Sequence, residues 1–242
     1  MRLKNADVAA SLDVAAIGAH PDDIEYGCGG ILLLAKEMSL RTGAVVLTRG
    51  EAGDHGTLTV RTAEARDAAA LLQLDEFSLW DYRDALLSAT DETTLLLTRW
   101  LKQRRPHLVL APHPADRHPD HLAAADLARR AVFLAARAKI LPELPAIPPV
   151  QIWWYALDAT VGPSPVLLVD ISMVWERKIG ALKAHVSQYE TNLASRTTTD
   201  RYLGSLAGVQ AAEGFIPDGP LVLSRELQLT WLTRLTVRPK GG

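Results

Sequence analysis

Cysteine is nearly absent from this sequence. Cys28 is the single cysteine among 242 residues, so no disulfide can form within one chain. A fold without disulfides is typical of proteins from reducing compartments. The N-terminal segment lacks the apolar core of a signal peptide, and no apolar run reaches the roughly 18 residues of a membrane span. These absences predict a soluble cytoplasmic protein that does not bind membranes.

An excess of charge of one sign is also missing. The 26 lysines and arginines nearly balance the 28 aspartates and glutamates. The chain therefore has neither the basic surface of a nucleic-acid-binding protein nor a polybasic membrane patch. Hydrophobic residues make up 48% of the sequence, and a chain of this length can form one α/β core. We expect a single domain over residues 1–242 that acts on a small molecule.

Short apolar strands alternate with helical segments in the first part of the chain. Apolar runs predict strands at 13–19, 44–48, 77–80 and 107–111, and helical patterns lie at 30–39, 62–72, 92–105 and 122–139. This alternation is typical of a doubly wound α/β fold, in which helices flank a mostly parallel, Rossmann-like sheet. The less regular part, 142–242, should complete the same domain, with strands at 151–156 and 166–170 and helices near 174–189 and after 200.

Two polar clusters follow predicted strands. His20-Pro21-Asp22-Asp23 comes after the first strand, and His118-Pro119-Asp120-His121 comes after a later one. The carboxyl ends of parallel strands meet at one edge of a sheet, so the two clusters should face each other. One His-Pro-Asp sequence alone is an ordinary turn. Two such clusters after buried strands, with no cysteine ligand, indicate a catalytic metal site that keeps one position open for water.

The spacing within each cluster separates the side chains by role. His20 and Asp23 can turn toward one metal ion, which leaves Asp22 free as a base beside a metal-activated water. His118 and His121 lie three residues apart at a predicted helix start, so one can bind the metal while the other faces the substrate. A non-catalytic sugar- or nucleotide-binding module is the alternative. The free carboxylate of Asp22 favours an enzyme.

At these residues the sequence resembles the LmbE/PIG-L family of zinc-dependent N-acetylglucosaminyl deacetylases. The similar blocks are 18–25 (GAHPDDIE), 27–30 (GCGG), 48–53 (TRGEAG), 61–64 (RTAE) and 116–121 (DRHPDH). The resemblance covers about 13–130 well and continues more weakly to about 216. It implies a zinc-dependent N-deacetylase, a hydrolase of a linear amide bond, that assembles as a homo-oligomer such as a trimer or hexamer. Fe²⁺, Co²⁺ or Ni²⁺ would also suit two histidines and one aspartate, so zinc depends on the resemblance.

The resemblance also implies individual roles. Three residues would bind the metal: His20, Asp23 and His121. Asp22 would be the general base. His118 would stabilise the transition state or act as the acid, and Asp120 would orient His118 by a hydrogen bond. Four residues would lie around the substrate: Arg61, Arg117, Asp84 and Glu51.

Within the family, the sequence is similar to the bacillithiol-type branch, which deacetylates N-acetylglucosaminyl malate. Arg117 precedes His118 as in that branch, whereas mycothiol-type enzymes have a tyrosine at the position of Asp116. Segments 185–189 (HVSQY) and 210–215 (QAAEGF) also resemble it. The guanidinium of Arg61 or Arg117 could pair with the malate carboxylates. The alternative substrates are other glucosamine conjugates: a chito-oligosaccharide, an antibiotic precursor or a mycothiol-like compound.

Overall fold

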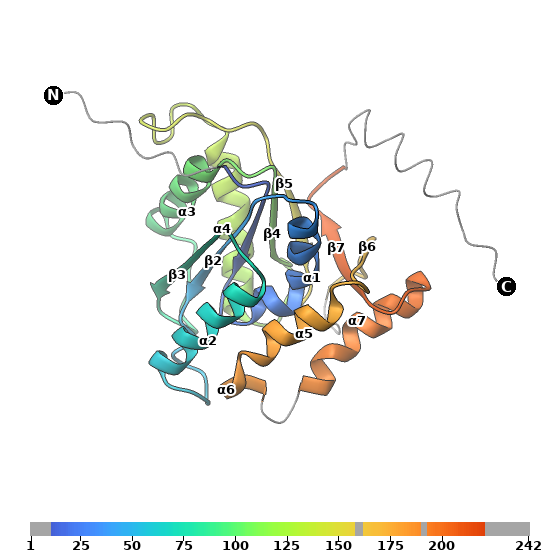
Figure 1. Ribbon diagram of the computed structural model, residues 1–242. Coiled ribbons are helices and arrows are strands. Elements are labelled where there is room, and N and C mark those ends of the chain that lie inside the picture. Colours follow the sequence, from blue (N-terminus) through green and yellow to red (C-terminus); the bar gives the residue numbers. More distant parts are fainter. Residues whose placement is uncertain (1–10, 158–161, 190–192, 221–242) are drawn as a thin grey trace.

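Seven strands form one sheet through the centre of the protein (Figure 1). The computed structural model describes residues 11–157, 162–189 and 193–220. The strand order is β3-β2-β1-β4-β5-β7-β6, in which β1 to β5 run parallel to one another and β7 is antiparallel to both β5 and β6. The strands are β1 (Val14–Gly18), β2 (Thr42–Thr48), β3 (Glu76–Tyr82), β4 (Leu108–Pro112), β5 (Gln151–Tyr155), β6 (Leu167–Asp170) and β7 (Ala212–Pro217).

The predicted α/β architecture with a mostly parallel sheet is confirmed. β1 pairs with β2 on one side and β4 on the other, and all five of its residues are buried, which explains its unbroken apolar sequence. β7 was not predicted, and it adds an antiparallel strand near one edge. β6 and β7 join the sheet that β1 to β5 form, so the less regular C-terminal part extends the same layer.

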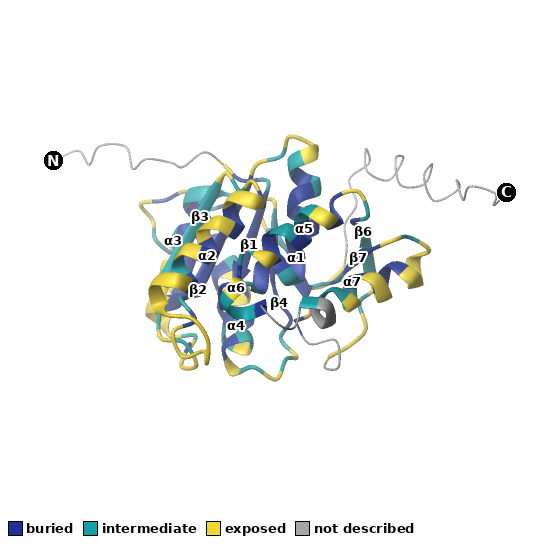
Figure 2. Cartoon of the chain, turned by 60° about the horizontal axis from the view of Figure 1, so that its bottom comes forward, coloured by how far each residue is buried: buried dark blue, intermediate teal, exposed yellow. Residues whose placement is uncertain are grey.

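Helices cover both faces of the sheet. α1 (Asp23–Glu37) and α5 (Trp175–Lys183) pack on one hydrophobic core, with α2 (Leu58–Leu71) against α5, and α3 (Asp91–Arg104) and α4 (Pro119–Ala135) pack on the other. α6 (Val186–Tyr189) and α7 (Leu193–Ala207) follow α5. Figure 2 shows the buried strands between helices whose outer surfaces are exposed. Within the described residues, none of the helices has the length and apolar content needed to cross a bilayer.

The helix that carries the first polar cluster begins earlier than the sequence predicts, and the helix that carries the second begins at the helix start predicted between His118 and His121. α1 begins at Asp23 and has a kink at Cys28, where φ is −151°. The carboxylate of Glu213 in β7 accepts hydrogen bonds from the backbone N–H groups of Gly30 and Ile31, at 2.6 and 2.8 Å, and so caps the second part of α1. α4 begins at Pro119, where proline is favourable in the first turn. Both helix starts therefore lie within the polar clusters.

A close contact behind the first cluster requires glycine. Gly27 faces the ring of Tyr155 so closely that a Cβ atom at this position would overlap the ring. The Tyr155 hydroxyl donates a 2.6 Å hydrogen bond to the carbonyl of Ile17 in β1. This contact presses α1 against the sheet and fixes the turn that carries His20 and Asp23.

Candidate metal centre

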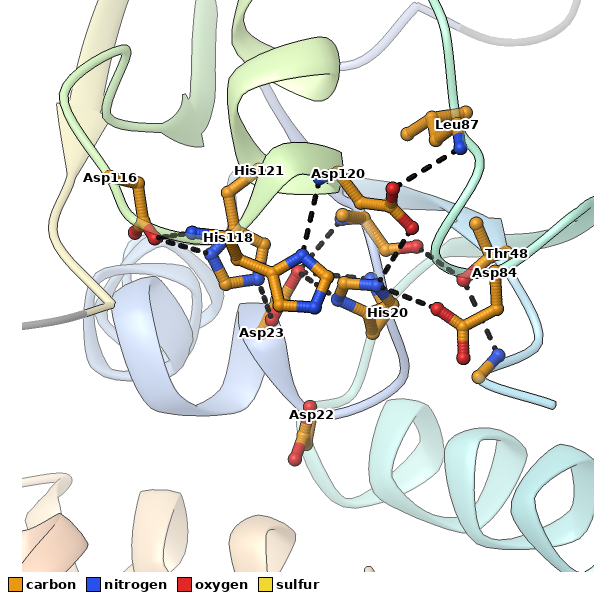
Figure 3. A network of polar contacts seen from close by, with 12 residues as sticks. His20, Asp22, Asp23, Thr48, Asp84, Leu87, Asp116, His118, Asp120 and His121 are labelled. Carbon is orange, nitrogen blue, oxygen red and sulfur yellow. Dashed lines mark hydrogen bonds and ion pairs between the residues drawn. The ribbon is translucent and has the colours of Figure 1, made fainter. Parts of the chain in front are cut away.

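The two polar clusters meet at the carboxyl ends of β1 and β4 (Figure 3). His20, Asp22 and Asp23 lie at the turn from β1 into α1, and His118 and His121 lie at the start of α4. All five line one cavity of about 280 Å³. The remaining lining residues are Tyr26, Ala52, Gly53, Arg61, Asp84, Ala85, Leu157 and Tyr189.

Asp23 lies between the two histidines predicted to bind metal. Its Oδ2 atom accepts backbone hydrogen bonds from Ala19 N at 2.8 Å and His20 N at 2.9 Å. These bonds fix the carboxylate and leave Oδ1 facing His121 Nε2 at 3.4 Å. His20 Nδ1 lies 3.7 Å from Oδ2. The turn therefore presents one imidazole nitrogen and one carboxylate toward a second imidazole, and these are ligands that Zn²⁺ accepts.

The other ring nitrogen of each histidine faces a carboxylate. His20 Nε2 lies 3.0 Å from Asp84 Oδ1 and 3.2 Å from Asp120 Oδ2. His121 Nδ1 lies 3.1 Å from Asp116 Oδ1. Metal-binding histidines generally have a carboxylate or carbonyl partner on the nitrogen that does not bind the metal, because this contact fixes the ring and raises its basicity. The pattern supports Nδ1 of His20 and Nε2 of His121 as the metal-facing atoms.

The electrostatics of the cluster favour a cation. Burial lowers the pKa of His20, but hydrogen bonds to Asp120 and Asp84 and the charge of Asp23 outweigh it and raise the pKa to about 10. Burial raises the pKa of Asp23, but His121 and His20 outweigh it and hold that pKa well below its usual range. Positive charge is thus stabilised here, as expected at a site built for a divalent ion. The donor set fits a metal.

Two sets of side chains come close enough to share an ion in the part of the chain that the structure describes. One is His20, His118 and His121, and the other is His20, Asp84 and Asp120. In the second set the carboxylates also accept backbone hydrogen bonds, from Ala52 N at 2.9 Å to Asp84 and from Ala85 N at 2.7 Å to Asp120. Those bonds indicate that Asp84 and Asp120 hold the His20 ring in place. Neither set includes Asp23, so the predicted set of His20, Asp23 and His121 is not one of the two.

Asp22 has a strained backbone and a carboxylate on the cavity wall. Its φ angle is 99°, in the left-handed region that non-glycine residues rarely adopt. Oδ2 of Asp22 accepts a 2.6 Å hydrogen bond from the Tyr189 hydroxyl. Burial and the adjacent charge of Asp23 raise the pKa of Asp22, and His185, Tyr189 and Arg61 offset only part of this rise. Strain at a non-glycine residue is typical of functional positions.

His118 is held as a neutral imidazole. Its Nδ1 accepts a 3.2 Å hydrogen bond from the backbone N–H of Asp120, so in the neutral ring Nε2 carries the proton. Burial and the nearby rings of His20 and His121 lower the pKa of His118. The hydrogen bond expected between Asp120 and His118 is therefore made by the Asp120 backbone and not by its carboxylate. Because Asp120 is the second residue of α4, its backbone N–H faces the His118 ring and its carboxylate points to His20 and to Ala85 N.

The four residues expected around the substrate occupy different places. Arg61 is 5% exposed, lines the cavity and donates a hydrogen bond to the Gly50 carbonyl. Asp84 also lines the cavity, where it contacts His20. Glu51 is exposed and accepts a 2.8 Å hydrogen bond from Asp84 N. Arg117 is exposed, and neither it nor Glu51 belongs to the cavity lining.

Two tyrosines of the cavity were not assigned from the sequence. Tyr26 follows the first cluster on α1, and Tyr189 is the last residue of α6. Tyr189 lies in segment 185–189, whose similarity to the bacillithiol-type branch was the only signal for it. The spacing of residues in the sequence could not predict the contact between Tyr189 and Asp22, because 167 positions separate them.

Comparison with known proteins places both clusters within one family match. The family described as PIG-L, GlcNAc-PI de-N-acetylase, matches residues 15–132. The chain is 28% identical over 226 residues to the diacetylchitobiose deacetylase of Thermococcus kodakarensis, covering 84% of this chain and 83% of that protein. It is 26% identical over 190 residues to the probable N-acetyl-alpha-D-glucosaminyl L-malate deacetylase 2 of Bacillus subtilis, covering 73% and 83%.

A solved structure extends the similarity to nearly the whole described fold. The crystal structure of a conserved protein from Thermus thermophilus superposes with a TM-score of 0.82 at 36% sequence identity. The superposition covers 88% of this chain and 98% of that one. The C-terminal strands and helices, beyond the family match, are thus also shared with a solved relative.

Proposed function

The chain belongs to the PIG-L family of deacetylases, and we propose that it hydrolyses the N-acetyl group of N-acetylglucosaminyl malate. It is an N-deacetylase with relatives that act on N-acetylglucosamine-type substrates. The observation that carries the mechanism is the arrangement of His20, Asp23 and His121, with Asp22 beside them on the cavity wall. A free carboxylate next to a set of metal ligands is what hydrolysis by activated water requires.

The ion in this proposal is Zn²⁺, held by His20, Asp23 and His121. Their donor atoms are two imidazole nitrogens and one carboxylate oxygen, which match catalytic zinc sites. When bound, the ion lowers the pKa of a water molecule and polarises the acetyl carbonyl. Asp84, Asp120 and Asp116 hold the two imidazoles in place from behind.

Asp22 removes the proton from the attacking water. The O–H bond breaks, the proton moves to the carboxylate, and the hydroxide oxygen forms a bond to the acetyl carbon. Burial and the charge of Asp23 raise the pKa of Asp22, which makes it a stronger base than an exposed carboxylate. As the bond to the acetyl carbon forms, the π electron pair of the carbonyl moves onto its oxygen. When the pair moves back, the C–N bond breaks and Asp22 returns the proton to the amine nitrogen, so acetic acid and a free amine form, and the acid then loses its proton to solvent as acetate.

His118 stabilises the negative charge that develops on the carbonyl oxygen. The bond from Asp120 N to Nδ1 makes Nε2–H the donor of the neutral ring, and the ring lines the cavity. The lowered pKa of His118 supports this neutral form at the pH of the cell. A fixed N–H donor aimed at a developing oxyanion is a large contributor to catalysis of acyl transfer.

Arg61 is the cavity residue that favours an anionic aglycone. It is the one lysine or arginine among the described residues of the cavity lining, and a guanidinium binds carboxylates with two hydrogen bonds. The competing substrate is diacetylchitobiose, because the Thermococcus relative carries that activity in its name. A homo-oligomeric assembly and a cytoplasmic location remain predictions from the sequence.

A substrate panel tests the proposal. Acetate and amine release would be measured for N-acetylglucosaminyl malate, diacetylchitobiose and an inositol conjugate, with Zn²⁺-loaded protein and a chelated control. We expect the malate conjugate to have the highest kcat/KM, and chelation to abolish turnover until Zn²⁺ is restored. A preference for chitobiose would overturn the malate assignment alone. Failure of the loaded protein to release acetate from any of the three would contradict the proposed function.

A further inference from the structure

The general base has a hydrogen-bond partner from a distant part of the chain. Within the described residues, the Tyr189 hydroxyl is the one group that donates to the Asp22 carboxylate, at 2.6 Å from Oδ2. The turn itself gives this carboxylate no capping bond, although Asp22 is the residue before α1. Tyr189 therefore decides how the Asp22 carboxylate is oriented.

Tyr189 is itself firmly placed. It is 8% exposed and packs in the hydrophobic core between the sheet, α1 and α5. Two residues earlier, Ser187 donates from its backbone N–H and its hydroxyl to the two oxygens of Glu64, at 2.8 and 2.6 Å. Gln188 donates from Nε2 to the His55 carbonyl at 3.0 Å. α6 is thus tied to α2 and to the loop before α2.

The attachment points of α6 lie next to the substrate cavity. Glu64 is one helical turn after Arg61 on α2, and both side chains are buried. The same short helix therefore contacts the base directly and, through Glu64, the helix that carries the cavity arginine. A bond between a buried phenol and a carboxylate is strong and directional because the acceptor is charged.

We infer that Tyr189 is a positioning residue for the base. Its O–H binds Oδ2 of Asp22 and leaves Oδ1, which accepts no hydrogen bond within the described residues, as the oxygen that receives the proton from water. This inference depends on the proposed function, in which Asp22 is the base. Loss of the hydroxyl should let the carboxylate rotate and misalign the proton transfer, while the substrate and metal contacts stay in place.

The test is a double-mutant cycle between Tyr189→Phe and Asp22→Asn. Tyr189→Phe should lower kcat roughly tenfold, with KM and metal content unchanged within about twofold. Tyr202→Phe is the matched control, because Tyr202 is 60% exposed on α7 and should keep wild-type kinetics. In the Asp22→Asn background the Tyr189→Phe change should have no further effect, since the group through which it acts is gone.

Each contrary result has a distinct meaning. An equal fall in kcat with and without Asp22, or a Tyr189→Phe variant with wild-type kcat, overturns the positioning role. If the loss appears in KM or in metal content, Tyr189 has a structural role and the inference is wrong. Full activity of metal-loaded Asp22→Asn would instead overturn the proposed function. Ser187→Ala, which loosens α6 but keeps the phenol, should show a smaller fall in kcat with unchanged KM.

Discussion

Two buried clusters of charged side chains lie along α1, and they differ in how their charges are balanced. The first surrounds His20 and Asp23 at the start of the helix. The second lies beside Gly30, where the fully buried ammonium of Lys178 is 2.9 Å from Asp200 Oδ1 and 2.8 Å from Glu213 Oε1. The side chains of both sets are largely buried, so burial of charge alone does not distinguish them.

The second cluster is closed by its own residues. Glu213 also accepts from the backbone of Gly30, and Asp200 Oδ2 accepts from Trp175 Nε1 at 3.2 Å. Burial lowers the pKa of Lys178, but Glu213 and Asp200 outweigh it and raise that pKa well above its usual value. A cation fixed in the chain thus balances the carboxylates, and no ligand is needed.

Among the residues that the structure describes, no lysine or arginine is paired with the carboxylates of the first cluster. Within the described residues, the ion pairs of Asp23, Asp84 and Asp120 are all with histidines. A histidine can balance them only by taking up a proton, and the raised pKa of His20 reflects that demand. The comparison teaches that buried carboxylates indicate a site for an external cation when no lysine or arginine of the chain is paired with them. Buried charge alone does not.

The largest expected effect is on catalysis in the first cluster, where loss of one carboxylate should lower the rate without destabilising the fold. Asp22→Asn should lower kcat by roughly 10²–10⁴-fold, the range for losing a general base, and leave the unfolding free energy and metal content close to wild type. Kinetics and metal content must be measured on the same sample because Asp22 adjoins a ligand. A metal-loaded variant within about threefold of wild-type kcat would show that Asp22 is not the base.

The second cluster should respond in the opposite way. Lys178→Met leaves two buried carboxylates without their cation, so the unfolding free energy should fall by about 3–5 kcal/mol, measured by urea denaturation. Lys183→Met, on the exposed side of the same helix, is the control and should change stability by less than about 0.5 kcal/mol. If Lys178→Met loses bound metal but keeps its stability, the Lys178 cluster supports metal binding and not the fold, and this assignment is wrong.

A smaller effect, on KM, is expected for the arginine of the cavity wall. Arg61→Ala should raise KM about tenfold more for the malate conjugate than for a neutral glucosaminide, because one charged contact is worth about this factor. Arg66→Ala, on the exposed side of α2, should leave the ratio unchanged. Equal increases for both substrates would assign Arg61 to supporting the loop through its bond to Gly50, and would remove the argument for an anionic aglycone.

The sequence was sufficient for the parallel sheet and for the two polar turns. β1 and β4 have unbroken apolar sequences because both faces of a parallel sheet are covered, so the positions of the loops that follow them could be inferred. The His and Asp residues at those strand ends then predict a metal site. These are local signals, readable within a few residues.

The contacts that complete the site could not be read in this way. Asp84 and Asp120 both reach His20 across the sheet edge, and Tyr189 reaches Asp22 from α6. β7 was missed because its sequence, with Gly214 and Pro217, lacks a strong strand pattern. Its Glu213 caps the part of α1 that follows the kink, a contact between residues 183 positions apart.

The most direct test of the central claim compares the metal content of two aspartate variants. Asp23→Asn removes the carboxylate that faces His121, whereas Asp84→Asn removes one behind His20. The metal-to-protein ratio and the Zn²⁺ affinity would be measured for both by elemental analysis and competition with a chelator. We predict that Asp23→Asn does not retain stoichiometric metal, and that Asp84→Asn retains it with an affinity about 10–100-fold weaker. Stoichiometric metal in Asp23→Asn together with its loss in Asp84→Asn would place the ion among His20, Asp84 and Asp120 and contradict this account.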